Sequence, residues 1–414
     1  MMTRVKIDTS RFKSDFDSLA TIGATNDGGV HRPALGPDHL KARQWFTQRA
    51  QRDGLTVNVD SAGNHSAVLL FPEAEKALLL GSHLDSVPYG GKYDGALGVV
   101  AALEVLSAIK ASGRSLGVNL EAVDFTDEEG TLVGALGSEA MAGELTPERL
   151  CNLRCSREEF VEALKRGDLK EESLFQARRN PDTLAGYLEL HIEQGPWLHD
   201  NRIDIGVVTS IVGSRSFRIS FNGRPDHAGT TPMTNRADAG LGACAFNLAL
   251  NDIVVKQFHD CVATVGGMEF KPGAFNIIPG QASLCLEFRS RDKDSLEKLK
   301  AGVINLANDV ARHRGLDVSL EEVAVWDPVH MSPDIQRIIN TSASNLGLST
   351  ASIASAAGHD AQSFAPIIPT GMIFIPSIGG ISHSPQEFSK WRDCVNGAKV
   401  LLNATLAAAE SLRG

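Results

Sequence analysis

Apolar residues follow two kinds of pattern along the first half of this 414-residue chain. In the stretch 37–53 the apolar positions recur every three or four residues, which predicts an amphipathic helix. The stretch 95–109 is rich in Ala, Val and Leu and predicts a buried helix. Short apolar runs predict strands at 55–59, 66–71, 77–81, 120–126 and 187–192. Strands that alternate with helices favour an α/β fold with a mainly parallel sheet covered by helices.

A different pattern begins near residue 211. Residues 216–222 alternate between apolar and polar, which is typical of a half-exposed strand. We expect a helix, two strands and a second helix to follow, at 236–249, 262–268, 283–289 and 295–312. This βαββα order predicts an inserted α+β domain with an antiparallel sheet and two helices, at 211–328. The α/β pattern then returns, so we expect a discontinuous catalytic domain at 1–210 and 329–414.

Two further segments carry local signals without chemistry of their own. Residues 144–182 are charged and helical in tendency, so we expect them to flank the core. Residues 384–387 read Ser-Pro-Gln-Glu, which predicts a helix start with a cap, Pro at the first position and Glu at the third. We expect a strand at 371–375 before it and a long C-terminal helix after it.

Bulk composition narrows the class of protein. A content of 43% hydrophobic and 22% charged residues is ordinary for a globular protein. The net charge of −10 disfavours nucleic acid and anionic membranes as partners. The start of the chain shows no apolar signal segment, and the six cysteines show no CxxC spacing, so we expect reduced thiols and a cytoplasmic location.

Five metal-capable residues stand at strand ends or in Gly-rich loops: His83, Asp94, Glu129, His191 and His383. Ligands of open parallel sheets collect beyond the carboxyl ends of the strands. A pair of divalent ions needs a bridging carboxylate and further carboxylates and imidazoles to complete each shell. Glu128, next to Glu129, would then be available as a general base, and Asp85 would hold the second ring nitrogen of His83.

Each residue has a plainer explanation when it is taken alone. A His-x-Asp pair such as His83 and Asp85 is more often an ordinary exposed pair, and Asp94 also suits a helix N-cap. The pair Glu128 and Glu129 also suits an acidic turn. It is their joint occurrence in one α/β pattern that predicts a two-metal site.

These segments resemble the amidases of the hydantoinase/carbamoylase family, which are relatives of the two-metal aminoacylases and carboxypeptidases. The resemblance covers nearly the whole chain. It is carried by GSHLDSV at 81–87, YDGALGV at 93–99, TDEEG at 126–130, GS at 137–138, HIEQGP at 191–196, DHAGTTPM at 226–233, GHD at 358–360 and ISHS at 381–384.

The resemblance implies a role for each matching position. Asp94 would bridge two divalent ions, with His83 and His191 completing one shell and Glu129 and His383 the other. The ions would be Zn, Mn, Co or Ni. Glu128 would be the general base and Asp85 the aspartate behind the site.

The resemblance also implies substrate contacts and a homodimer. The inserted domain would serve as a dimerisation and lid domain, with His227 reaching the partner's active site to polarise the substrate carbonyl. Asn276 and Arg289 would hold the substrate carboxylate. Further pocket residues would be Gln194, Gly358 and His359.

The implied activity is hydrolysis of the carbamoyl C–N bond of an N-carbamoyl-L-amino acid or a similar ureido acid, releasing ammonia, CO2 and the amino acid. One departure leaves the substrate open, since Leu132 and Val133 stand where many family members carry Arg-Phe. An allantoate or ureidoglycolate amidohydrolase and an N-acyl-amino acid amidase remain alternatives, as do a peptidase and a non-catalytic ligand-binding homologue. Retention of Glu128 beside all five candidate ligands argues against the last.

Overall fold

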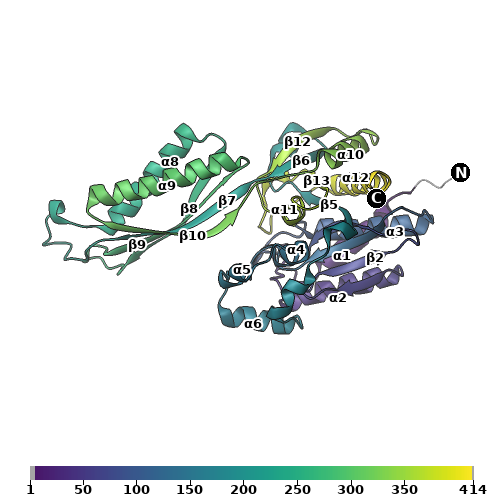
Figure 1. The fold of residues 1–414 in the computed structure, drawn as a ribbon, viewed down its shortest axis with the longest axis horizontal. Helices are drawn as coiled ribbons and strands as arrows, with labels where there is room; N and C mark the ends of the chain where they lie inside the picture. Colours follow the sequence, from purple (N-terminus) through teal and green to yellow (C-terminus); the bar gives the residue numbers. More distant parts are fainter. Residues whose placement is uncertain (1–4, 413–414) are drawn as a thin grey trace. The chain divides into compact units, whose positions relative to one another are not determined.

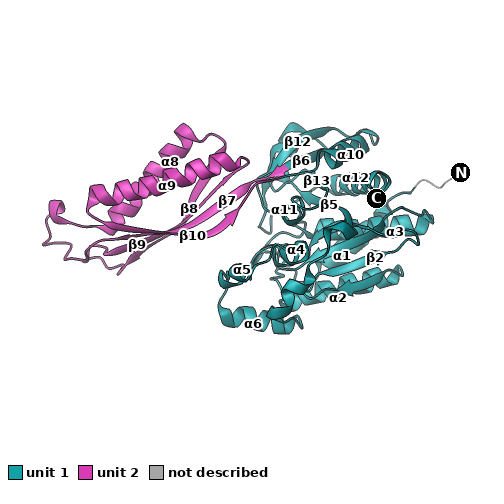
Figure 2. Ribbon diagram, viewed as in Figure 1, with its two compact units in different colours: residues 1–209, 330–414 teal, residues 210–329 magenta. Residues whose placement is uncertain are grey.

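The computed structural model describes residues 5–412, and they form two compact units. Unit 1 combines the chain up to residue 209 with the chain from residue 330, and unit 2 is residues 210–329 (Figure 2). A mainly parallel sheet with helices lies in one part, and a separate antiparallel sheet with two helices lies in the other (Figure 1). The expected fold class is confirmed.

The larger sheet has nine strands within the described residues. Along the sheet the order is β1 (Thr56–Val59), β2 (His65–Leu69), β4 (Asn119–Phe125), β3 (Ala77–His83), β5 (Leu184–Ile192), β13 (Thr370–Ile375), β6 (Ile205–Ile211) and β11 (Val329–His330), and β12 (Thr350–Ser355) pairs with β6. The four central strands β4, β3, β5 and β13 are mutually parallel, and antiparallel pairs flank them. Every residue of β3, β5 and β13 is buried, as a sheet covered on both faces requires.

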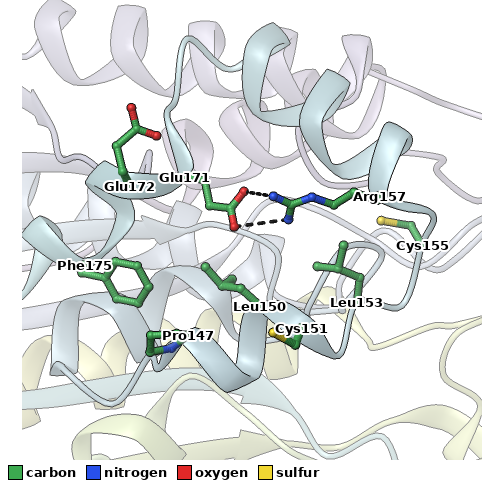
Figure 3. A pocket seen from close by; sticks show the side chains of 9 residues that line it. All are labelled: Pro147, Leu150, Cys151, Leu153, Cys155, Arg157, Glu171, Glu172 and Phe175. Carbon is green, nitrogen blue, oxygen red and sulfur yellow. Dashed lines mark hydrogen bonds and ion pairs between the residues drawn. The ribbon is translucent and has the colours of Figure 1, made fainter.

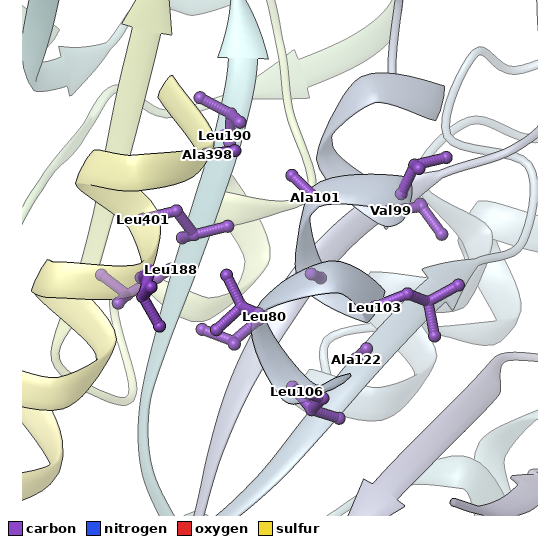
Figure 4. Packing of buried hydrophobic residues seen from close by; sticks show 14 of the residues in the cluster. Leu80, Val99, Ala101, Leu103, Leu106, Ala122, Leu188, Leu190, Ala398 and Leu401 are labelled. Carbon is purple, nitrogen blue, oxygen red and sulfur yellow. The ribbon is translucent and has the colours of Figure 1, made fainter. Parts of the chain in front are cut away.

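Helices α3 (Ala96–Ser112) and α12 (Trp391–Ser411) contribute much of the apolar cover. Figure 4 shows Leu188 and Leu190 of β5 near Ala398 and Leu401 of α12, with Leu80 of β3 beside α3. Full burial of one Leu side chain contributes roughly 1.5–3 kcal/mol, so this cluster stabilises the strands that lead to the site.

The other helices of unit 1 lie around this core. They are α1 (Thr9–Ala20), α2 (Pro37–Arg52), α4 (Leu136–Ala142), α5 (Pro147–Cys151), α6 (Arg157–Arg166), α7 (Trp197–Asn201), α10 (Pro333–Ser344) and α11 (Ala361–Phe364), with 3-10 turns at Glu171–Ala177, Pro181–Thr183 and Ile378–Gly380. The charged segment 144–182 forms α5, α6 and the first of these turns. It has a separate apolar cluster, in which Phe160 and Leu164 pack with Leu132, Val133 and Leu136.

The segment 144–182 also borders an open cavity of about 810 Å³ (Figure 3). Leu150, Leu153 and Phe175 supply apolar walls, and Arg157 forms an ion pair with Glu171 at its side. No residue of the predicted metal site lines it.

Unit 2 is an antiparallel sheet packed against two helices. Its strands lie in the order β10 (Asp317–Trp326), β7 (Gly213–Asn222), β9 (Gln281–Ser290) and β8 (Cys261–Lys271). Helices α8 (Ala239–Gln257) and α9 (Lys293–Arg314) bury one face, where Phe217 stacks on Phe288 with ring centroids 6.0 Å apart; a short 3-10 turn lies at Met233–Asn235. By length and composition alone α8 is apolar enough to cross a membrane, but its Ala243, Phe246 and Leu250 pack in this core.

Several elements differ from the sequence expectation, among them β6, β11 and β12 of the larger sheet, where no strand was expected. Strand β10 was not expected, because its apolar alternation is broken by Glu321-Glu322, where the structure has a register shift. The predicted helix start at 384–387 is wrong, because α12 begins only at Trp391. The side chain of Glu387 turns inward instead and is 4% exposed.

Candidate metal centre

The five metal-capable residues gather at one edge of the larger sheet. His83 is the last residue of β3, and His191 lies next to the end of β5. Glu129 follows β4, Asp94 precedes α3, and His383 lies in the loop after β13. Because the four central strands are parallel, their carboxyl ends meet at this edge.

Asp94 lies at the centre of the group. Its Oδ1 is 3.0 Å from Nε2 of His191 and 3.7 Å from Nε2 of His83. Its Oδ2 is 3.5 Å from Nε2 of His383, and that nitrogen is 3.3 Å from Oε2 of Glu129. Asp94 is therefore shared by two groups of metal-capable side chains, and the donor atoms of each group lie within 4.8 Å of one another.

The spacing of these donors fits divalent metal ions. In a tetrahedral shell with bonds of about 2.1 Å, neighbouring donor atoms lie about 3.4 Å apart. The four distances around Asp94 and His383, from 3.0 to 3.7 Å, bracket that value. Imidazole and carboxylate donors together suit Zn and its first-row neighbours.

The two buried imidazoles are oriented for ligation through Nε2. Nδ1 of His83 is 3.0 Å from the carbonyl oxygen of Asp85, and Nδ1 of His191 is 2.9 Å from the carbonyl oxygen of Ile192. A carbonyl oxygen only accepts, so each Nδ1 carries a proton, and each Nε2, which faces Asp94, is the nitrogen available to bind an ion.

Asp85 differs in detail from the expectation. The backbone carbonyl of Asp85, and not its carboxylate, accepts the hydrogen bond from the His83 ring, and the carboxylate is 3.7 Å from the ring nitrogen. The carboxylate accepts the N–H groups of Glu128 at 3.3 Å and Glu129 at 3.2 Å. Asp85 therefore fixes the backbone of both glutamates, whose turn leaves these donors without a strand partner.

Left-handed backbone conformations cluster around the site. Asp127, Gln194 and His383 have φ values of 58°, 59° and 54°, which side chains with a Cβ rarely adopt. The carboxylate of Asp127 compensates by accepting three N–H groups of the following loop, at 2.6–3.0 Å. At Gly95, with φ 61°, a methyl group would overlap the ring of His83.

The site holds an excess of buried carboxylates. Burial, with the charge of Asp94 next, raises the pKa of Glu129 well above its ordinary value. Burial also acts to raise the pKa of Asp94, but the adjacent histidines, His191 foremost, lower it below its ordinary value. Burial opposes protonation of His191, yet Asp94 and then Glu189 raise its pKa to about 9. So much negative charge away from water favours bound cations.

Glu128 has the features of a general base. Its Oε2 is 3.5 Å from Nε2 of His83, and its side chain is 11% exposed. Within residues 5–412 no hydrogen bond is made to its carboxylate. Burial, followed by the charges of Asp360 and Glu129, raises its pKa well above the ordinary value, in the direction that a general base needs.

The predicted pocket residues of unit 1 also lie here. Gln194 donates from Nε2 to Oδ2 of Asp94 at 2.7 Å. His359, which follows Gly358, packs its ring 4.4 Å from that of His191. His191 and His359 also form a third group of donors with Glu189, but the Glu189 carboxylate already accepts from Ser82 at 2.8 Å and Ala361 at 3.1 Å.

Three predicted substrate residues lie in unit 2. His227 and Asn276 are exposed on two loops joined by the bond from the Ala228 N–H to the Asn276 carbonyl, 3.0 Å. Nδ1 of His227 accepts the N–H groups of Gly229 and Thr230, at 3.0 and 3.1 Å, so its neutral ring carries the proton on Nε2.

Arg289 lies far from those loops within unit 2. Asn276 precedes β9, whereas Arg289 is the last but one residue of β9 and pairs with Ser214. At 3.3 Å per residue the strand from Gln281 to Arg289 spans roughly 26 Å. Within one chain, Arg289 and Asn276 therefore lie toward opposite ends of β9, and their shared role at a substrate carboxylate stays a prediction.

The sequence reasoning missed Glu387. Its carboxylate accepts the N–H groups of Tyr93 at 2.9 Å and Asp94 at 3.1 Å. The hydroxyl of Ser382 lies 3.1 Å from both Glu387 and Asp94. The only sequence signal was an acid four residues after His383, and its spacing from Ser384 favoured a helix cap.

Comparisons with known proteins show the family to which this chain is related. Residues 79–407 match the family described as Peptidase family M20/M25/M40. An N-carbamoyl-L-amino-acid amidohydrolase of Paenarthrobacter aurescens is 35% identical over 98% of this chain and 99% of its own. A ureidoglycolate hydrolase of Arabidopsis thaliana is 34% identical over 98% of this chain and 88% of its own.

Solved structures give the same result. An amidase of the hydantoinase/carbamoylase family from Burkholderia vietnamiensis superposes with a TM-score of 0.86 and 35% identity, over 99% of each chain. The fold and site thus define a metal-dependent hydrolase of C–N bonds in linear amides. The chain belongs to peptidase family M20/M25/M40 and, within it, to the hydantoinase/carbamoylase amidases.

Proposed function

We propose that this protein is a two-metal amidohydrolase that cleaves the carbamoyl C–N bond of an N-carbamoyl-L-amino acid or a similar ureido acid. The observation that carries the proposal is Asp94, which is shared by two donor groups beside the available carboxylate of Glu128. The carbamoyl amidohydrolase of Paenarthrobacter aurescens, related over 98% of the chain, supports the substrate class.

His83, Asp94 and His191 would hold one ion, and Asp94, Glu129 and His383 the other. Bound there, divalent Zn, Mn, Co or Ni would supply Lewis acidity and lower the pKa of water. Oδ1 of Asp94 lies on the side of His83 and His191, and Oδ2 on the side of His383, so each donor group would use its own oxygen of Asp94.

The protein's own groups would carry the proton and orient the substrate. Glu128 takes a proton from the attacking water and delivers it to the leaving nitrogen, releasing ammonia and a carbamate that breaks down to CO2 and the amino acid. The Nε2–H of His227 donates to the carbonyl oxygen as negative charge develops on it. The guanidinium of Arg289 binds the substrate carboxylate.

A homodimer would bring these groups together. Because His227 and Asn276 lie at the opposite end of the unit 2 sheet from Arg289, one site that uses all three needs two chains. Strand β8 is at the edge of its sheet, and α8 exposes Leu241, Leu248 and Val255 on its surface. An edge strand and an apolar helix face support a twofold contact through unit 2.

A ureidoglycolate-type substrate is a second candidate. It is favoured by the Arabidopsis thaliana ureidoglycolate hydrolase and by a solved structure of AtUAH in complex with (S)-hydroxyglycine, which has a TM-score of 0.86. Leu132 and Val133 are buried in the cluster under segment 144–182, so the departure from Arg-Phe places apolar side chains in the core there. We also propose a cytoplasmic location, which the six free cysteines support.

The first experiment is a substrate panel with metal-depleted protein resupplied with Mn, Co, Ni or Zn. It would contain N-carbamoyl-L-amino acids, their D-enantiomers, N-carbamoyl-β-alanine, allantoate, ureidoglycolate and N-acetyl amino acids, read by released ammonia or free amine. Metal-dependent turnover of the L-carbamoyl class is expected. Turnover of ureidoglycolate alone would establish the second candidate, and turnover that needs no metal would contradict both.

A further inference from the structure

Glu387 is a buried carboxylate without a role in the proposed reaction. It lies between His383 and α12, and it is 4% exposed. Its Oε1 accepts the N–H groups of Tyr93 at 2.9 Å and Asp94 at 3.1 Å. Its Oε2 is 3.1 Å from the hydroxyl of Ser382, the residue before His383.

These contacts join the two loops that define the second donor group. One loop carries Asp94, the shared residue, and the other carries His383. Asp94 and His383 are distant in sequence, and His383 is in the strained left-handed region with φ 54°. The side chain of His383 is 52% exposed, so packing against other residues does little to fix its position.

Gly91 lies directly against the carboxylate of Glu387. A methyl group on Gly91 would overlap the carboxylate, so the loop 90–95 is shaped around it. The hydroxyl of Ser382, which contacts Glu387, is also 3.1 Å from Oδ2 of Asp94. The bond network therefore runs from Glu387 through Ser382 to the shared residue.

We propose that Glu387 is a positioning residue that sets the affinity of the ion held by Asp94, Glu129 and His383, by fixing the loops of Asp94 and His383 together. The inference rests on the proposed two-metal function. Groups behind a metal's direct ligands typically change its affinity 10–100-fold when they are removed. The other ion would be held by His83, Asp94 and His191. The rings of the two histidines are fixed by backbone carbonyls close to β3 and β5, so this ion would depend less on Glu387.

The test is calorimetric titration of metal-free protein with Mn or Zn, together with the number of ions retained after desalting. Glu387→Gln keeps an oxygen for the two N–H groups but places an NH2 group toward Ser382, and Glu387→Ala removes both contacts. We expect about 10-fold weaker binding of one ion in the first variant and about 100-fold in the second. The other ion should bind with less than a threefold change.

Glu104→Gln is the matched control. Glu104 is a fully buried carboxylate two turns into α3, where it accepts the Asp8 N–H at 2.7 Å and pairs with Arg11. Its substitution makes the same chemical change in unit 1 away from the donors. Glu104→Gln is expected to leave the affinities for both ions unchanged. For Glu387→Gln, excess metal should restore activity, because the variant is expected to fold and to differ only in how tightly it binds one ion.

Gly91→Ala approaches the same carboxylate from the other side. In an otherwise wild-type chain, the added methyl group should weaken binding of the ion at Asp94, Glu129 and His383. In the Glu387→Ala background it should have little further effect on that binding, because the overlap is gone. If the wild type binds two ions and the Glu387 variants bind both as tightly, this inference fails alone. If the wild type binds fewer than two ions, the proposed function fails and the inference with it.

Discussion

The two groups of predicted functional residues differ in how much of their environment is already formed. In unit 1, Asp85, Asp94 and His191 are at most 4% exposed, and each has hydrogen-bond partners that fix its direction. In unit 2, His227 and Asn276 are exposed on loops. The partly exposed Arg289 donates from Nε to Oε1 of Glu287 at 2.8 Å. The difference teaches that the candidate hydrolytic half is organised within one chain, whereas in the proposed homodimer the substrate-binding half would be completed by a second chain.

The largest expected effect tests the preorganised half. Glu128→Gln should lower kcat by roughly 10²–10⁴-fold, because the amide cannot take a proton from water. Metal content, measured by elemental analysis, should not change, since Glu128 is in neither donor group. Activity within tenfold of the wild type would remove Glu128 from the role of base.

The next effect tests whether the exposed half is shared between chains. His227→Ala and Arg289→Ala should each lower kcat/KM by roughly 10²-fold, since each removes one oriented polar contact to the substrate. Mixed after dissociation and reassociation, the two variants should recover up to about a quarter of wild-type activity, because half the dimers carry one intact site.

The control for that mixture uses two residues from the same end of unit 2. His227→Ala mixed with Asn276→Ala should recover nothing, because both residues serve the same site and every site in the mixed dimer lacks one of them. Equal recovery in the two mixtures, or none in either once mixed dimers are demonstrated, would contradict the composite site.

The smallest effect concerns the stability of unit 1, where buried polar groups make folding depend on pH. Burial, with Arg43 next, lowers the pKa of His65 to about 4. The unfolded side chain, with a pKa near 6.5, binds a proton first, so this contribution is complete above about pH 6.5 and is lost as pH falls toward 4. The loss at pH 5 is about 2 kcal/mol.

Urea unfolding at pH 7 and pH 5 measures it. The difference in unfolding free energy between the two pH values should be about 2 kcal/mol smaller in His65→Gln than in the wild type. His199→Gln, at a partly exposed position, is the control. The same pH dependence in the wild type and His65→Gln would show that His65 does not contribute.

The sequence predicted the parts of the molecule that follow from local patterns. The apolar runs placed the strands of the parallel core, and the polar residues just beyond them, such as His83 and Glu129, meet because parallel strands end at one edge. The roles taken from family resemblance, including those of His227 and Arg289, stay predictions.

The remainder depends on contacts between distant segments, which no local pattern encodes. Glu387 has the spacing of a helix cap, yet it accepts N–H groups from a loop almost three hundred residues earlier. Asn276 and Arg289 are thirteen positions apart in sequence, and only the straight course of β9 shows that they are separated. Strand β10 was missed because two adjacent glutamates interrupt its alternation.

The position of β13 has a consequence for biosynthesis. This strand fills the place between β5 and β6, although it is formed by residues 370–375, after all of unit 2 has been made. Unit 2 is one continuous segment and can fold while the ribosome is still producing the rest of the chain. The larger sheet cannot close until its last central strand emerges, and His383 follows that strand by only a few residues. A nascent or truncated chain would therefore lack part of the candidate metal centre, and ions bound there would stabilise only the finished protein.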